Sequence, residues 1–498
     1  MWMQLPDRSR ACSLSSLSLS LSPLRRAARR SVPGLVLAAL ASLSPGCSEG
    51  GADRPPTMMT TMMPDMAEAP LTGNPIWARA LGSTAFDVAT AAAADPSQPG
   101  TALYAGTVEG EVDLGQGPRA GAGGYDVFLG RYAADGQPVW TRRYGSPAEE
   151  RPFGVAVGGD GSVVLVGYFK GTLRFGTFEL TTAGDGDLFV AKLTGAGEPL
   201  WARRFGGPGN DSAQAVAVDG QGGIVVTGYC GGGCDLGQGA VAGAGAIDAF
   251  VLKLTPAGAP VWSRQFGSPG SDAGFGITVD GMGRVTAAGG FRGAMDPGSG
   301  RLAHAGKDDA FVAQYAADGT PLWARSFGGP SDDDATSIAA GSDGTLVVGG
   351  YYQETMTAAR TLLQSQGKED LFVLRLGPGG EELWARSGGG PGTDAATGVA
   401  LDRRGVLVCG YFTERVDLGG GPLRGAGDLD ALVARLSPSG EHIWSKGIGG
   451  SGSDAATAIA ADASGLAVAG YIQGTLDSGG GPVTSAGGYD ALLCRLAP

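Results

Sequence analysis

A tryptophan returns about every sixty residues along most of this chain. The intervals between successive members of the series are 63, 61, 61, 61, 61 and 60 residues. The series is Trp77, Trp140, Trp201, Trp262, Trp323, Trp384 and Trp444. A chain of 498 residues would ordinarily divide into roughly two to four domains. A fixed repeat takes precedence over that length argument, because each copy must be a structural unit that packs on its neighbours.

Each repeat contains four short segments with the composition of β-strands. In one unit they are PLWARRFG, AQAVAVD, GIVVTGY and DAFVLKL, each bounded by Gly, Pro or Asp. The 91 glycines indicate many turns, and 43% hydrophobic residues are enough for a core. Four strands in such a unit match one blade of a β-propeller, a fold with typically about 4 to 8 blades. We therefore predict an all-β fold, a single seven-bladed propeller of four-stranded antiparallel blades over residues 74–498, with 28 strands.

Charged residues recur at fixed distances from each tryptophan. A base lies two residues after it: Arg79, Arg142, Arg203, Arg264, Arg325, Arg386 and Lys446. An acid lies ten residues after it: Asp87, Glu150, Asp211, Asp272, Asp333, Asp394 and Asp454. An aspartate also opens every DAFV-type segment: Asp126, Asp187, Asp248, Asp309, Asp370, Asp430 and Asp490. A group present in every unit cannot mark one active site, so we predict that these side chains form a hydrogen-bonded or ionic lock between strand ends in each blade.

The glycine of the GIVVTGY-type segment is followed by tyrosine in five units. These residues are Tyr168, Tyr229, Tyr351, Tyr411 and Tyr471. Glycine inside a strand usually marks a close backbone approach or a bulge. If the rings faced outward at one rim, they would form an aromatic surface suited to sugars or apolar groups. Packing between neighbouring blades explains the same rings with fewer assumptions, and both interpretations stay open.

The first 73 residues have the features of an export signal followed by a tether. Arginines precede an apolar run from Val32 to Leu43, which has the length of a signal-peptide core and is too short to cross a bilayer. The run ends before Cys47, in a sequence that resembles the bacterial lipoprotein signal, although Ser44 and Pro45 depart from its usual pattern. We predict a signal over residues 1–46, lipid attachment at Cys47 and a disordered linker over 47–73. Simple secretion is the alternative.

Charge argues against nucleic acid as a partner. The formal net charge is −13, and residues 1–46 contain six Arg and one Asp, so the remainder carries −18. Nucleic-acid affinity depends on neutralising phosphates with Lys and Arg. We expect a monomer that meets the membrane only through the lipid anchor.

Three features could suggest metal binding or catalysis. The GGxGxD turns at 206–211 and 449–454 resemble calcium-binding β-rolls, but copies that far apart along the chain cannot share an ion. Calcium is kept as an alternative, and no cofactor is predicted. Cys230 and Cys234 lack the second ligand pair of a zinc site, so a short disulfide or two free thiols is expected in an oxidising compartment. His304 and His442 occupy non-equivalent positions, and we predict no catalytic residue.

The pattern W-A-R-x-F-G-G-x-G-x-D, followed by A-V-A-V-D and V-x-V-x-G-Y, closely resembles the bacterial seven-bladed β-propeller (SBBP) repeat family. The resemblance covers residues 74–498, about 85% of the chain, and implies fold and surface location more than an activity. A more distant similarity links DAFVLKLTPAGAPVWSRQFG to quinoprotein dehydrogenases and to the outer-membrane assembly lipoprotein. The adjacent cysteine pair typical of the dehydrogenases is missing here. In propellers of this type the AVAVD strand is innermost and the Trp strand outermost, which implies that residues 75–79 complete the last blade beside 490–496.

Three functions fit the sequence. The first is a non-enzymatic envelope or surface lipoprotein that binds a protein or glycan. The second is a propeller enzyme acting at the central channel, a quinone- or calcium-dependent oxidoreductase, lyase or hydrolase, which a non-repeated cluster of carboxylates would favour. The third is an outer-membrane assembly scaffold. Residues that break the repeat are candidate contacts, above all the segment 352–360 with Tyr352, Glu354 and Arg360; neutral drift is the competing explanation.

Overall fold

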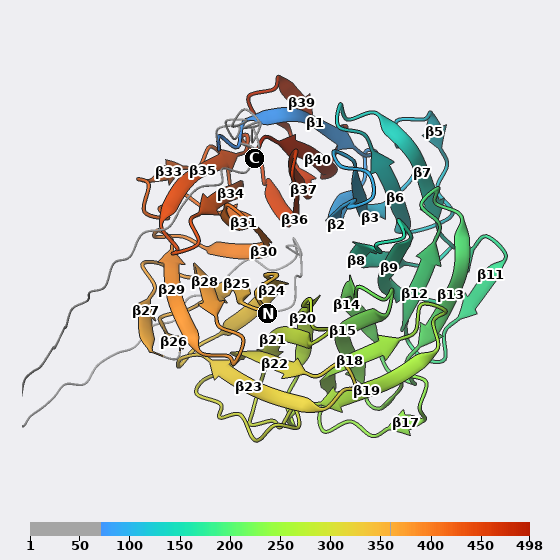
Figure 1. Ribbon diagram of the computed structural model, residues 1–498. Helices are drawn as coiled ribbons and strands as arrows, with labels where there is room; N and C mark the ends of the chain where they lie inside the picture. Colours follow the sequence, from blue (N-terminus) through green and yellow to red (C-terminus); the bar gives the residue numbers. More distant parts are fainter. Residues whose placement is uncertain (1–70, 359) are drawn as a thin grey trace, which may run out of the picture. The chain divides into compact units, whose positions relative to one another are not determined.

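The repeat units fold into seven four-stranded antiparallel sheets. The computed structural model describes residues 71–358 and 360–498, so the signal segment and Cys47 lie outside the described residues. Figure 1 shows the sheets arranged as blades around a central axis, with the AVAVD-type strands nearest the axis and the Trp strands at the circumference. The described residues contain no helix. The predicted all-β, seven-bladed propeller is confirmed.

The 28 blade strands occupy four concentric positions. The innermost strands are β2 (Val88–Ala94), β8 (Glu150–Val157), β14 (Ser212–Val218), β20 (Ala273–Val279), β24 (Asp333–Ala340), β30 (Asp394–Asp402) and β36 (Ala455–Asp462). The second strands are β3 (Ala102–Val108), β9 (Val163–Phe169), β15 (Ile224–Gly231), β21 (Val285–Phe291), β25 (Leu346–Tyr352), β31 (Gly405–Phe412) and β37 (Gly465–Ile472). The third strands are β6 (Asp126–Tyr132), β12 (Asp187–Leu193), β18 (Ile247–Leu254), β22 (Asp309–Tyr315), β28 (Asp370–Leu376), β34 (Asp430–Leu436) and β40 (Asp490–Leu496). The outermost strands are β7 (Pro138–Tyr144), β13 (Pro199–Phe205), β19 (Pro260–Phe266), β23 (Pro321–Phe327), β29 (Glu382–Gly388), β35 (His442–Ile448) and β1 (Pro75–Leu81).

Six short hairpins, which the strand signals did not predict, join the second strand to the third. They are β4 (Val112–Asp113) with β5 (Pro118–Arg119), β10 (Thr172–Phe175) with β11 (Phe178–Thr181), β16 (Cys234–Asp235) with β17 (Ala240–Val241), β26 (Thr355–Ala358) with β27 (Thr361–Gln364), β32 (Arg415–Val416) with β33 (Leu423–Arg424), and β38 (Thr475–Asp477) with β39 (Pro482–Thr484). The fourth blade makes this connection, residues 292–308, without strand pairing.

The ring closes through its first strand. β1 pairs antiparallel with β40, with Ala78 opposite Cys494 and Leu81 opposite Ala491. The last blade therefore takes its outermost strand from the start of the propeller, as predicted. A hydrogen bond also joins the last blade to the first. The hydroxyl of Thr457 on β36 donates to the backbone carbonyl of Ala89 on β2 at 2.7 Å.

The repeated tryptophans join each blade to the next one. The indole N–H of Trp262 donates to the carbonyl of Ala317 at 3.0 Å, in the turn between the third and outermost strands of the following blade. The ring also covers Gly319 of that turn, where an added Cβ would lie 2.7 Å from the indole. Gly319 has a φ of 86°, which glycine adopts without strain. Trp140, Trp262 and Trp444 are buried, and the other four are half-buried.

An ionic lock inside the blade uses residues other than those predicted. Asp95 follows the first innermost strand, and its carboxylate lies 2.6 Å from the guanidinium of Arg131 on the third strand, with both side chains buried. Equivalent pairs are Asp219 with Lys253, Asp402 with Arg435 and Asp462 with Arg495. These contacts hold the inner and third strands together at the face opposite the hairpins.

Candidate functional site

Two kinds of connection emerge on the same side of the ring. Because the strands are antiparallel, the hairpins after the second strand and the turns from one blade to the next leave their sheets in the same direction. Isolated bridges join the two, as between Gly206 and Asp235 and between Gly389 and Asp417. We call this side the hairpin face. The repeated acids, the tyrosines and the segment 352–360 all lie there.

The two repeated acids meet in pairs beneath this face, one from each of two neighbouring blades. At the junction of the second and third blades, Asp211 accepts hydrogen bonds from the backbone N–H groups of Gly207 at 2.6 Å and Gly231 at 2.9 Å. Asp187 accepts one from the N–H of Ala183 at 2.6 Å. Both side chains are fully buried. The acids therefore hold turns together, as predicted, through backbone amides, and Asp187 also forms an ion pair with Arg204 at 3.0 Å.

Two carboxyl groups lie so close together that only glycine fits at position 206, and burial raises the pKa values of several of the repeated acids. A Cβ on Gly206 would lie 2.4 Å from Oδ1 of Asp187 and 2.6 Å from Oδ2 of Asp211. Burial, with a smaller effect of the neighbouring Asp187, raises the pKa of Asp211 to about 6. Burial likewise raises the pKa of Glu150 to about 7, of Asp394 to about 7 and of Asp333 to about 8. Desolvation disfavours the charged form of each acid.

The repeated bases do not pair with these acids, which corrects the predicted lock. Arg142 donates from Nε to the carbonyl of Gly197 at 3.1 Å, in the turn of the next blade, and its guanidinium lies 2.6 Å from Glu198. Arg386 makes the same contacts with Gly440 and Glu441. The periodicity places base and acid in every unit, but it does not tell whether a side chain turns toward its own blade or the next.

The five tyrosines are packing residues in this structure. Tyr168, Tyr229, Tyr351 and Tyr471 are 7–9% exposed, and Tyr411 is half-buried. Tyr168 lies against Gly186, where an added Cβ would be 2.3 Å from the ring. These rings do not form an exposed aromatic platform, because they are buried or half-buried; Tyr471, for example, packs edge-on against Tyr489.

The segment 352–360 contains both buried and exposed side chains. Tyr352 is fully buried, and its hydroxyl lies 2.6 Å from Oγ of Ser387. Glu354 and Arg360 are exposed, and the hairpin formed by β26 and β27 also presents Leu362, which is 68% exposed. Of the three residues named from the sequence, the structure leaves Glu354 and Arg360 free to meet a partner.

A group of acids outside the repeat lies at the junction of the fourth and fifth blades. Asp308 forms a bidentate ion pair with Arg292, at 2.6 Å through both Nε and Nη2. The carboxylate of Asp332 lies 3.7 Å from Lys307. Asp334 accepts a hydrogen bond from the hydroxyl of Tyr351 at 2.5 Å and fills the space left by Gly290, which stands where most units have a tyrosine. Each of these acids therefore has a structural partner.

A hollow of about 540 Å³ opens on the hairpin face between the last blade and the first. Its lining includes Ser83, Glu109 and Glu111. Neither histidine belongs to it: His304 lies near the carbonyl of Lys307 in the fourth blade, and His442 near Ser445 on β35. The hollow thus offers carboxylates and hydroxyls without an imidazole.

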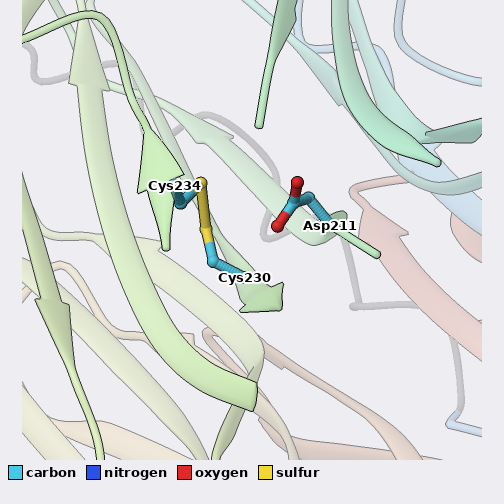
Figure 2. A group of neighbouring side chains, drawn as sticks. All are labelled: Asp211, Cys230 and Cys234. Atoms are coloured by element: carbon cyan, nitrogen blue, oxygen red, sulfur yellow. A yellow bond between two sulfur atoms is a disulfide. The ribbon is translucent and has the colours of Figure 1, made fainter. Parts of the chain in front are cut away.

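The third blade contains the one described group of three side chains close enough to share a metal ion. Cys230 at the end of β15 and Cys234 at the start of β16 form a disulfide, and the carboxylate of Asp211 lies beside it (Figure 2). The three ligand atoms are within 4.8 Å of one another, and all three residues are buried. The sequence did not indicate that Asp211 lies beside the cysteines, because β14 and most of β15 separate it from Cys230 along the chain. Cys409 on β31 and Cys494 on β40 are free thiols buried in strands.

Comparisons with known proteins do not assign this chain to a family. No protein-family model matches the chain. The regulatory protein FlaEY of Caulobacter vibrioides is 26% identical over 315 residues, which cover 58% of this chain and 32% of FlaEY. The chain therefore spans about a third of that relative. Sqt1 from Chaetomium thermophilum is 11% identical with a TM-score of 0.42, covering 86% of this chain and all of Sqt1. A protein of unknown function from Dyadobacter fermentans is 12% identical with a TM-score of 0.37, covering 86% of this chain and all of that one.

Proposed function

We propose that the protein is a non-enzymatic scaffold of the cell envelope that presents the hairpin face of its propeller to a protein or glycan. Its place in the SBBP repeat family and a lipid anchor at Cys47 are parts of the same proposal. The fold supports a binding role, because the blades form a rigid frame on which loops can differ from one another. Loops carried by a rigid frame are common sites of binding.

The assignment of the repeated polar groups supports this proposal most directly. Trp262, Arg142 and Asp211 each bond to backbone groups that hold turns or join blades. The acids at the junction of the fourth and fifth blades, which an enzyme would use, are bonded to Arg292, Lys307 and Tyr351. The residues that remain for recognition are therefore those that differ between blades and are exposed.

The hairpin of the fifth blade is the best candidate for the contact surface. It carries an exposed aliphatic side chain, Leu362, next to the charged Arg360. Its backbone is fixed by contacts with the outermost strand, since the N–H of Arg360 donates to Glu382 at 2.5 Å. A fixed hairpin loses little conformational entropy on binding, which favours affinity.

A pair of matched variants tests the binding role. The double variant Arg360→Ser, Leu362→Ser removes the exposed groups of this hairpin. The variant Val241→Ser makes a similar change on the hairpin of the third blade, where Val241 is 51% exposed. We expect the double variant to lose capture of exported proteins, or signal on a glycan array, with unchanged thermal melting, while Val241→Ser retains both. Equal binding by wild type and the double variant would exclude this hairpin.

Membrane attachment is tested separately from binding. Replacing Cys47 by serine should abolish incorporation of a radiolabelled fatty acid and release the protein from the membrane fraction. Labelling that persists in the Cys47→Ser variant would contradict a lipid anchor at this position.

A further inference from the structure

The cysteine pair occupies two positions that are apolar in the other six blades. The residues equivalent to Cys230 are Val108, Phe169, Phe291, Tyr352, Phe412 and Ile472. The residues equivalent to Cys234 are Val112, Leu173, Met295, Met356, Val416 and Leu476. These positions need only apolar volume in the scaffold, so two cysteines that face one another in a single blade add chemistry that the scaffold does not require.

The acid beside the cysteines is supplied by the repeat itself. Asp211 stands where every blade has an acid, and its two bonds to Gly207 and Gly231 fix the carboxylate next to the sulfur atoms. Asp187, on its other side, is also buried, and its charge is balanced by Arg204 at 3.0 Å. The third blade therefore combines two soft ligands with one preoriented oxygen ligand in a buried site.

We propose that the reduced dithiol of Cys230 and Cys234, together with the carboxylate of Asp211, binds a borderline divalent cation of the zinc class. Zinc is held by thiolate sulfur and carboxylate oxygen, and three protein ligands leave a fourth position for water. Both thiols lose their protons to solvent as the metal binds. The disulfide and the metal are then alternative states of one site, since a sulfur atom in a disulfide is not a thiolate.

Conversion between the two states needs a dithiol reductant. Thiol–disulfide exchange transfers two electrons and two protons from that dithiol to the cystine of Cys230 and Cys234, and the reductant becomes a disulfide. In the reverse exchange, a disulfide oxidant takes the two electrons and two protons from Cys230 and Cys234 and becomes a dithiol.

The local geometry allows the metal-bound state with small movements. Zinc–sulfur bonds of about 2.3 Å and zinc–oxygen bonds of about 2.0–2.2 Å place tetrahedral ligand atoms roughly 3.4–3.8 Å apart, and the three atoms here already lie within 4.8 Å of one another. Gly232 and Gly233 between the cysteines have φ values of 72° and 111°, which give this loop freedom to adjust. Gly232 is exposed, so the loop is also the route by which an ion would enter.

Cadmium binding to the full-length protein tests the proposal. The protein is reduced with a dithiol, freed of reductant without oxygen, and titrated with Cd²⁺ while the ultraviolet thiolate-to-metal absorption is recorded. We expect the reduced wild type to bind one equivalent more than the Cys230→Ser, Cys234→Ser double variant, which corrects for the other cysteines. The oxidised wild type should match the double variant. Bound Cd²⁺ should also slow re-formation of the disulfide by an added oxidant.

Variants at the acid test the third ligand. Asp211→Asn should weaken this binding at least about tenfold, because even the loss of an outer-shell partner typically costs that much. Asp272→Asn, the same change in the next blade, where no cysteines lie nearby, should leave it unchanged. Asp211→Ser is a second variant that keeps a hydrogen-bond acceptor for the turn if the amide disturbs folding. Equal titrations for reduced wild type and the double cysteine variant would overturn the proposal, as would undiminished affinity in a folded Asp211 variant.

Discussion

At the scale of the residue, a tryptophan of one blade packs against the turn glycine of the next blade. A glycine stands four residues before each repeated tryptophan, and the indole that covers it belongs to the preceding blade. The indole of Trp77 covers Gly136, that of Trp201 covers Gly258, and that of Trp444 covers Gly73 near the start of the propeller. A side chain at these glycines would displace the ring, so the two residues are required together.

Trp262→Ala should destabilise the propeller by about 3 to 5 kcal/mol, the usual cost of emptying a large buried site. Trp262 is 8% exposed and its indole N–H is bonded to Ala317. Urea denaturation followed by circular dichroism measures the change. The neighbouring Val261, which is 47% exposed, is the control, and Val261→Ala should change stability by less than about 0.5 kcal/mol. A Trp262→Ala variant as stable as wild type would show that the ring is not structural.

The buried acids predict a pH dependence of stability. Burial raises the pKa of Asp333 to about 8, whereas an unfolded aspartate has a pKa of about 3.9. Between these values the folded protein holds a proton that the unfolded chain releases, so the free energy of unfolding falls as pH rises from about 4 to about 8. Glu150, Asp211 and Asp394 act in the same direction.

Asp333→Asn should make this pH dependence shallower, since one titrating group is removed. Urea denaturation at several pH values between 5 and 8 measures the slope, which one group changes by at most about 1.4 kcal/mol per pH unit. Asp318→Asn is the control, because Asp318 lies in a fully exposed turn and its pKa is lowered by bonds to Thr320. An unchanged slope in Asp333→Asn would show that Asp333 is already ionised in the folded protein.

At the scale of the strand, β1 closes the ring by completing the last blade. It covers the edge of β40 through six paired positions and brings Trp77 to the turn of the first blade, where its indole donates to Ala134 at 3.0 Å. Deleting residues 74–84 should expose this edge and sharply lower the melting temperature. Substituting Asn74 alone, whose side chain accepts a bond from Lys446, is the milder comparison. Unchanged melting after the deletion would refute closure by β1.

At the scale of the whole molecule, the seven outermost strands form an exposed circumference that must not pair with other chains. Five of them begin with proline. In β19 the register shifts at this start: Pro260 pairs with Leu254 and Trp262 with Lys253, so the exposed Val261 has no partner on the neighbouring strand. Prolines and bulges on edge strands prevent edge-to-edge pairing. We expect a monomer in sedimentation equilibrium of the Cys47→Ser protein, with no change over a tenfold range of concentration. A stable dimer would show that these edges or the hairpin face self-associate.

The resemblance to known propellers implies which strand closes the ring, whereas the sequence alone determines the number of blades and the four strands in each. It does so because these properties depend on a period that is repeated seven times and on apolar patterns within a few residues. The tertiary structure decides which repeated polar groups meet. Trp262 bonds to Ala317 and Asp211 lies beside Asp187, and a period places an equivalent residue in every blade without saying which copy is the partner. It also decides exposure: Tyr351, which the sequence left open as a rim aromatic, is only 9% exposed, whereas Leu362, which the sequence did not single out, is 68% exposed.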